Sequence, residues 1–273
     1  MNPAPLPRLS LLVLALIVLA ALLVPVLSPW TYYEPSWDEI DLPPTWHNGH
    51  WLGTDDLGRD LLVRLMWGCR ISLLVAVAAS LTSLVIGVLW GVTAGYVGGR
   101  LDSWMMRSVD VLYAVPFIPF VIVLTVLFGR NLVLLFVAIG AVSWLDTARI
   151  VRGQAMALRE REFITAARVG GMGSTQIIRR HVLPNLAGIV AVYLTLTIPT
   201  VILIEAFLGY LGLGAQAPLT SLGVMIADGA AQLRARPRLL LCPAVLLTLL
   251  VFCCNRVGDA LRDRFDPASG SAP

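Results

Sequence analysis

The chain has 273 residues, of which 58% are hydrophobic and 14% are charged, with a formal net charge of +3. A soluble domain is about 25% charged and has no interior large enough to hide such an apolar excess, so much of this surface must face lipid. The composition therefore excludes a soluble enzyme, a disordered chain and a disulfide-stapled secreted module. No basic cluster is interleaved with aromatic residues, so nucleic acid is not expected as a partner.

Six apolar stretches are long enough to span a membrane, which takes about 20 residues. They predict an all-α integral membrane protein, because backbone polar groups in lipid must bond within their own segment. We expect residues 1–69 to hold a cytoplasmic tip, an uncleaved anchor helix and an extracytoplasmic segment, residues 70–260 to form a transmembrane core, and residues 261–273 to be a cytoplasmic tail. The predicted spans are residues 9–27, 71–97, 111–128, 132–150, 186–208 and 239–255.

The placement of arginine predicts the orientation. With the N-terminus inside, 13 arginines fall on the inner side and 7 on the outer side. Inner loops of membrane proteins carry the excess of basic residues. We therefore expect a multi-pass protein of the cytoplasmic (inner) membrane with both termini in the cytoplasm. Residues 151–185 then form the longest cytoplasmic loop, and residues 30–70 lie outside.

All twenty basic residues are arginine, and the sequence contains no lysine. A P-loop requires Gly-Lys-Ser/Thr, so this chain can hold no such nucleotide site. If the protein's work consumes ATP, another chain must bind it.

The outer segment before the second span carries histidines beside acidic residues. His47 and His50 lie near three aspartates, but the spacing is loose and the surrounding residues favour turns. We predict an ordered loop here rather than a metal site. Thr54 or Asp55 is expected to cap a helix that begins at Asp56.

The cytoplasmic loop has an organised pattern. Residues 154–169 are good helix formers, residues 170–173 are rich in glycine, and Ser174 can cap a second helix that runs to about His181. The turn is expected to need a positive φ, which glycine adopts freely. Ile177 and Ile178 give the second helix a narrow apolar side that suits a groove of a partner protein. The alternative is a helical hairpin that caps the bundle without a partner.

This loop resembles the EAA loop of bacterial ABC importer permeases. The spacing is kept by Thr165-Ala166-Ala167, Gly171, His181 and Leu183-Pro184. Thr165 stands in place of the glutamate of the pattern, and His181 stands where the broad pattern has isoleucine. Glu162, which is three residues before Thr165 and on nearly the same helix face, could serve in its place.

Other motifs indicate which branch of these permeases the chain resembles. Residues 50–60 are similar to the signature of the peptide-importer branch, and residues 142–154, 209–219 and 258–267 resemble the C-type permease subunit of oligopeptide and dipeptide importers. The residues of the signature are His50, Gly53, Thr54, Asp55, Gly58, Arg59 and Asp60.

The resemblance implies a six-span transmembrane domain of a type I ABC importer. It implies a second homologous permease subunit, two ABC ATPase subunits that bind ATP and magnesium, and an extracytoplasmic peptide-binding protein. The permease itself would lie in membrane lipid, pass a peptide and hold no catalytic residue, cofactor or metal. The residues implied in coupling to the ATPases are Glu162, Thr165, Ala166, Ala167, Gly170, Gly171, Ser174, Ile177, Ile178, His181, Leu183 and Pro184.

Residues inside two of the spans are candidates for the transport pathway. Pro116 and Pro119 in the third span and Pro199 in the fifth interrupt helix hydrogen bonds, and broken helices tend to line cavities. Glu205 lies near the outer end of the fifth span. It is either an outer gate or a contact for a peptide amine, or an interfacial structural carboxylate held by a backbone donor or by an arginine of the partner permease subunit.

Three alternatives compete with the peptide importer. The same architecture could import dipeptides, glutathione or nickel chelates. A self-sufficient secondary transporter would show an inverted repeat and an ion site at the midplane, and the sequence has neither. A membrane-anchored assembly or sensor protein would leave the loop pattern unexplained.

Overall fold

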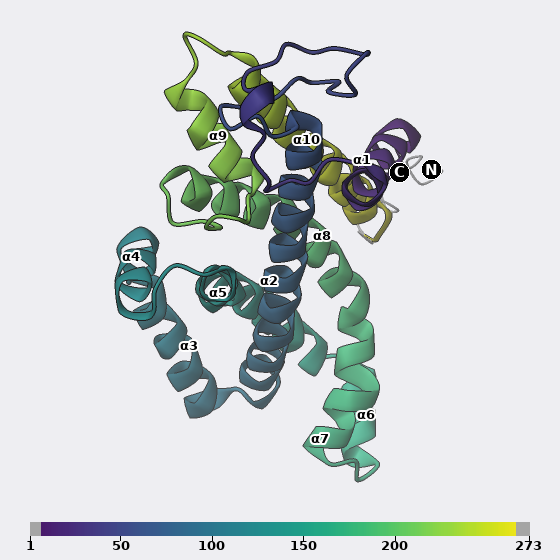
Figure 1. Ribbon diagram of the computed structural model, residues 1–273. Coiled ribbons are helices and arrows are strands. Elements are labelled where there is room, and N and C mark those ends of the chain that lie inside the picture. Colours follow the sequence, from purple (N-terminus) through teal and green to yellow (C-terminus); the bar gives the residue numbers. More distant parts are fainter. Residues whose placement is uncertain (1–6, 266–273) are drawn as a thin grey trace.

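The computed structural model describes residues 7–265 of the chain, and all regular structure within them is helical (Figure 1). Residues 1–6 of the predicted N-terminal tip and residues 266–273 of the predicted tail lie outside the described part. The elements are α1 (Arg8–Leu27), a 3-10 turn (Trp37–Glu39), α2 (Leu61–Val97), α3 (Gly99–Tyr113), α4 (Phe117–Phe128), α5 (Leu132–Arg159), α6 (Glu162–Val169), α7 (Ser174–Ile177), a π-helical turn (Ile178–Val182), α8 (Leu183–Tyr210), α9 (Leu222–Ala231) and α10 (Arg238–Phe265).

Five helical segments are long and apolar enough to cross a membrane, and the pair α3–α4 makes a sixth if it is counted as one span. The six predicted spans thus correspond to six helical segments. The other five are α1, α2, α5, the run from Ser174 to Tyr210, and α10 up to Arg264.

The predicted third span is wrong, because residues 111–128 do not form one continuous helix. Residues 111–113 belong to α3, and the chain bends by 78° before α4 begins at Phe117. Pro116 stands immediately before α4 and Pro119 lies in its first turn. Proline is tolerated there because the first N–H groups of a helix have no intrahelical partner. These prolines therefore start a helix instead of interrupting one.

Other boundaries also differ from the predicted ones. α2 begins at Leu61 rather than residue 71, and α5 continues to Arg159, well beyond residue 150. α10 extends to Phe265, so the predicted tail from residue 261 begins inside a helix. Hydropathy marks only the lipid-exposed part of a helix, whereas hydrogen bonding carries the helix into the polar region on either side.

The 37-residue α2 is the central element of the fold, and its closest partner is α5 (Figure 1). Gly87, Gly91 and Gly95 repeat every four residues on the α2 face that meets α5. A Cβ at Gly87 would come within 2.6 Å of Thr147, and one at Gly91 within 2.6 Å of the Ala148 carbonyl oxygen. Small residues at this spacing let two helix backbones approach closely in lipid. The α2–α5 pair is thus a fixed frame for both ends of the molecule.

The two ends carry different elements. In Figure 1, the segment before α2 gathers with α9 at one end, and α6 and α7 lie at the opposite end. α8 runs between the two ends, packs on α2 and α10, and connects the loop of α6 and α7 to α9.

Candidate functional site

The cytoplasmic loop predicted from the sequence folds as α6, a glycine turn, α7 and the π-helical turn. The predicted helix over residues 154–169 is split, because α5 ends at Arg159 and α6 begins at Glu162. The predicted positive φ occurs at Gly171, at +84°, with no atom near the place where a Cβ would stand. The backbone therefore demands glycine here, although the surrounding space would admit a side chain.

The start of the second helix differs from the expected one. Gly173 is the N-cap residue, and Ser174 is the first helical residue and makes no side-chain capping bond. The helix does not stop near His181, because α7, the π-helical turn and α8 follow one another without a break from Ser174 to Tyr210. Pro184 is the second residue of α8 and lies just after the π-helical turn, so its missing N–H falls where the helical hydrogen-bond pattern changes.

Apolar side chains attach the loop to the rest of the chain. Ile164 and Ile177 are buried in a cluster with Val92 of α2 and Val151 of α5. The prediction that Ile177 faces a partner groove is therefore wrong, since this side chain faces the chain's own core. Ile178 is half-buried. The cluster therefore packs the loop against the central α2–α5 pair.

The outward face of the loop is polar and basic. Of the predicted coupling residues, Glu162, Thr165, Ala166, Gly170, Gly171, Ser174 and Pro184 are exposed, and Ala167, His181 and Leu183 are half-buried. Arg168, Arg179 and Arg180 are exposed, and none of the ion pairs found within residues 7–265 involves them.

Sequence reasoning missed two apolar residues on this outward face. Phe163 and Val169 are 42% and 84% exposed. Phe163 follows the charged Glu162 at the start of α6, and Val169 lies between Arg168 and Gly170 at the end of α6.

The signature residues before the second span form a compact structure at the end of the molecule that the sequence predicts to face outward, which is named the outer end below. The Asp60 carboxylate accepts the Val63 N–H at 2.7 Å and contacts Nδ1 of the buried His50 at 2.8 Å. The cap of α2 is therefore Asp60, not Thr54 or Asp55, and the helix begins five residues later than predicted. The Thr54 hydroxyl accepts the Leu42 N–H. Gly53 and Gly58 both have positive φ.

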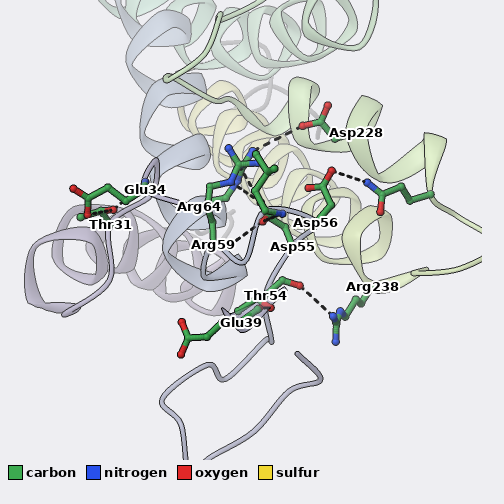
Figure 2. Close-up of polar contacts among 12 residues, drawn as sticks. Thr31, Glu34, Glu39, Thr54, Asp55, Asp56, Arg59, Arg64, Asp228 and Arg238 are labelled. Carbon is green, nitrogen blue, oxygen red and sulfur yellow. Dashed lines mark hydrogen bonds and ion pairs between the residues drawn. The ribbon is translucent and has the colours of Figure 1, made fainter. Parts of the chain in front are cut away.

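Asp55 joins this outer structure to the start of α2. Its Oδ1 accepts the N–H groups of Leu57 and Arg59, and its Oδ2 lies 2.8 Å from Arg59 Nε and 3.0 Å from Arg64 Nη1. Nη2 of Arg64 reaches to 3.8 Å from Asp228 on α9 (Figure 2). Within residues 7–265, no group of three or more histidine, cysteine, aspartate or glutamate residues is arranged to hold a metal ion.

A second ion cluster fixes the link between α9 and α10. The Asp41 carboxylate lies 2.8 Å from Arg236 Nε and 2.7 Å from Arg238 Nη2. Arg238 also donates to the Thr54 carbonyl oxygen (Figure 2). The outer segment, α9 and the start of α10 are therefore tied together by charge.

Glu205 is fully buried where α2, α8 and α9 meet. Its Oε2 accepts the Ser72 hydroxyl at 2.6 Å, and Ser72 Oγ in turn accepts the N–H of Leu222, the first residue of α9. This geometry favours the structural interpretation of Glu205. Pro199 is buried within α8, whereas Pro116 and Pro119 are exposed.

Comparisons with known proteins place the chain in a family. Residues 87–270 match the model of the binding-protein-dependent transport system inner membrane component, and residues 5–44 match that of the N-terminal transmembrane domain of oligopeptide transport permease C. The chain belongs to the family of binding-protein-dependent transport system inner membrane components, and it is a multi-pass membrane protein.

Several members of the family are similar to this chain in sequence over most of its length. The chain is 48% identical to the oligopeptide transport system permease protein OppC of Haemophilus influenzae and 51% identical to OppC of Escherichia coli K12. Each match spans 258 residues, which are 94% of this chain and 83% and 85% of the relatives. Bacillus subtilis OppC is 43% identical over 94% of this chain and 84% of the relative.

The fold also matches a solved transporter. An inward-facing structure of the MetNI methionine ABC transporter matches 74% of this chain and 96% of that chain, with a TM-score of 0.59 and 21% sequence identity. At this identity the match shows the fold alone. The predicted family and the all-α type I ABC importer transmembrane fold are confirmed.

Proposed function

We propose that the chain is the transmembrane permease subunit of an ATP-driven ABC importer, which takes oligopeptides across the cytoplasmic membrane by alternating access. The observation that carries this proposal is the 48–51% identity to OppC proteins along 258 residues, which reaches both the cytoplasmic loop and the outer segment. Dipeptides, glutathione and nickel chelates remain as alternative cargoes for the same architecture.

The loop of α6 and α7 couples the permease to ATP hydrolysis. ATP and magnesium are bound by two partner ATPase subunits, and this chain is not itself a catalyst. Two features support docking at the loop: unpaired Arg168, Arg179 and Arg180, and the exposed apolar Phe163 and Val169. ATP-driven closure of the ATPases moves the docked loop. Ile164 and Ile177 pass this movement to α2 and α5.

The other partners are a second homologous permease and an extracytoplasmic peptide-binding protein. The coupling role requires the loop and both termini to lie in the cytoplasm, and the outer segment to face the binding protein. Single cysteines at Ser36 and Ser174, in a background without the native cysteines, test this orientation. An impermeant reagent applied from outside should label the cysteine at position 36 and spare position 174. The reverse pattern contradicts both the orientation and the docking role.

Reconstitution tests the transport function. The chain is purified with its second permease, its two ATPases and its binding protein, and the complex is placed in proteoliposomes. We expect uptake of labelled oligopeptides that requires both ATP and the binding protein. Uptake that persists without the ATPases would indicate a secondary transporter. Uptake of dipeptide, glutathione or a nickel chelate, with no uptake of oligopeptides, would establish the alternative cargo.

A further inference from the structure

Four polar side chains form an exposed face where α3 packs beside α5 (Figure 1). Nη2 of Arg149 lies 2.7 Å from the Asp110 carboxylate, and its guanidinium carbon lies 4.4 Å from the centre of the Tyr113 ring. The Tyr113 hydroxyl donates to the Asp146 carboxylate at 2.9 Å. All four side chains are exposed on this chain. Together, Asp110, Tyr113, Asp146 and Arg149 are called the polar face below.

The packing of α5 on α2 gives the level of the polar face along the helices. Thr147 of α5 lies against Gly87 of α2, so the neighbouring Asp146 is level with Gly87. Residues 71–97 of α2 contain no charged residue. This apolar run continues past the polar face by about 24 Å on one side and about 15 Å on the other, at about 1.5 Å per residue. The polar face therefore lies at the depth of the lipid hydrocarbon.

Charged side chains at this depth do not face hydrocarbon. Charged residues in membrane spans almost always face the protein interior or a water-filled cavity. Asp146 takes part in none of the ion pairs found within residues 7–265, so its carboxylate has only the Tyr113 hydroxyl to stabilise it. Because the polar face is exposed on this chain, water or another protein must cover it.

The backbone beside the polar face independently indicates water. The link from Ala114 to Pro116 is not helical, and its residues are exposed where the chain bends by 78° between α3 and α4. It directly follows Tyr113 and so lies at about the depth of Asp146. Non-helical backbone at membrane depth is tolerated only where it is buried in protein or lines a water-filled cavity. The exposure of this link favours the cavity.

The other spans offer no exposed charge to a polar substrate. Over residues 9–27, 71–97, 117–128, 186–208 and 239–255, the only charged residue is Glu205, which is fully buried. A peptide carries charged termini and polar amides, which are costly to place against hydrocarbon. On this chain, the polar face is thus the wall along which such a substrate crosses at the lowest cost.

We propose that the polar face lines the water-filled passage through which the transported peptide crosses the membrane. The inference rests on the proposed function and assigns a wall to its passage. Arg149 and Tyr113 hold α3 and α5 together at this wall, and the unpaired Asp146 gives it a negative charge that suits the cationic groups of a peptide.

Labelling of introduced cysteines in the complete reconstituted complex tests this passage. Ala114→Cys and Asp146→Cys are made in a background without the native cysteines of this chain, and Leu89→Cys, at a position 61% exposed on α2 near the same level, is the matched control. A membrane-impermeant cationic thiol reagent is added from the ATPase side, and mass spectrometry detects its attachment to this chain. Ala114→Cys and Asp146→Cys should react, and Leu89→Cys should not, because an ionised reagent does not enter hydrocarbon.

Alternating access adds a second expectation. A non-hydrolysable ATP analogue with loaded binding protein should slow the reaction of Ala114→Cys, since the passage then closes toward the ATPase side. The reacted Ala114→Cys complex should lose peptide uptake, whereas Leu89→Cys treated in the same way should keep it.

Other results overturn the inference. An unlabelled polar face in a complex that still takes up peptide would exclude the passage and leave the importer function intact. Labelling of the chain purified alone, but not of the complex, would place the second permease on the polar face. Equal labelling of Leu89→Cys would put this level outside the hydrocarbon, and a reaction that the ATP analogue does not change would separate this water from the passage. If the wild-type complex takes up no peptide, the proposed function itself fails, whatever the labelling.

Discussion

The two ends of this chain handle charge in opposite ways. At the outer end, the Asp55 carboxylate forms ion pairs with two arginines, and the Asp41 carboxylate forms ion pairs with two others. Nδ1 of His50 lies 2.8 Å from the Asp60 carboxylate. At the other end, the loop of α6 and α7 makes no ion pair within residues 7–265, although it carries several exposed arginines. Apolar contacts of Ile164 and Ile177 hold that loop in place.

We interpret this difference as that between a scaffold and the contact surface proposed for the loop. Charges that are paired within the chain fix one arrangement of segments, and removing one partner leaves a costly buried charge. Charges left unpaired on a rigid support cost little in water and are available to a partner. The outer end is thus expected to respond to substitution through stability, and the loop through coupling.

The largest effect is expected at the loop. Gly171→Asp replaces a residue with positive φ and adds a charge to the proposed docking face, where burying it without a partner is costly. Peptide uptake should be lost while the chain still inserts and purifies, and the ATPases should detach or ignore the loaded binding protein. Gly173→Ala is the matched control, because Gly173 has a φ of −68° and open space around it. Normal uptake in Gly171→Asp would indicate that the loop only caps the helix bundle and has no coupling role.

The ion cluster of Asp55, Arg59 and Arg64 at the outer end should respond to substitution through a loss of stability. Asp55→Asn leaves Arg59 and Arg64 without their shared carboxylate and should lower the free energy of unfolding by about 3 kcal/mol, as expected for a broken buried pair. Thermal unfolding of the purified chain in detergent measures this change. Asp38→Asn, at an exposed position, should be neutral. Equal stability of the two variants would contradict the scaffold role.

The buried side of the loop allows a finer test. Ile177→Ala removes a fully buried side chain and should cost about 2 kcal/mol, at the low end for such truncations because the end of a bundle can collapse around the gap. Hydrogen exchange should rise in α6 and α7 and stay unchanged in α9. Ile178→Ala, at a half-buried position, should change exchange less. If both variants behave alike, the inward direction of Ile177 is not important for anchoring.

Glu205 distinguishes a gate from a structural link. Glu205→Gln keeps an acceptor for the Ser72 hydroxyl, so we expect a stability change of about 1 kcal/mol or less. Uptake per assembled complex should stay within about twofold of the wild type. Lost uptake in a fully assembled complex would restore the interpretation of Glu205 as an outer gate.

The smallest effect concerns Asp228 and pH. Its pKa is raised by burial and by Asp56, so its contribution to stability is greatest in acid and is lost as the pH rises through that pKa. Asp228→Asn should therefore melt slightly above the wild type at pH 7.5, and the difference should shrink toward pH 3.5. Melting curves of the empty complex across this range test the sign. A variant that melts lower at neutral pH would indicate that Asp228 is already neutralised by a partner.

Several features of the protein follow from local sequence alone. The apolar segments are readable because solubility in lipid is a property of each stretch of about 20 residues. The turn at Gly171 is readable because a positive φ is a local requirement. The spacing from Thr165 to Pro184 and the order of the other motifs were sufficient to predict the family.

The tertiary structure decided how these segments face one another. Ser72 and Glu205 are 133 positions apart, and Ser72 and Leu222 are 150 apart, so no local pattern could pair them. The choice of Asp60 over its neighbours as the cap of α2 depended on the fold of the whole outer segment around His50. The inward direction of Ile177 depended on apolar neighbours in α2 and α5. Helical periodicity shows that a residue lies on an apolar face, but only the packing of distant helices decides whether that face meets the chain's own core or a partner.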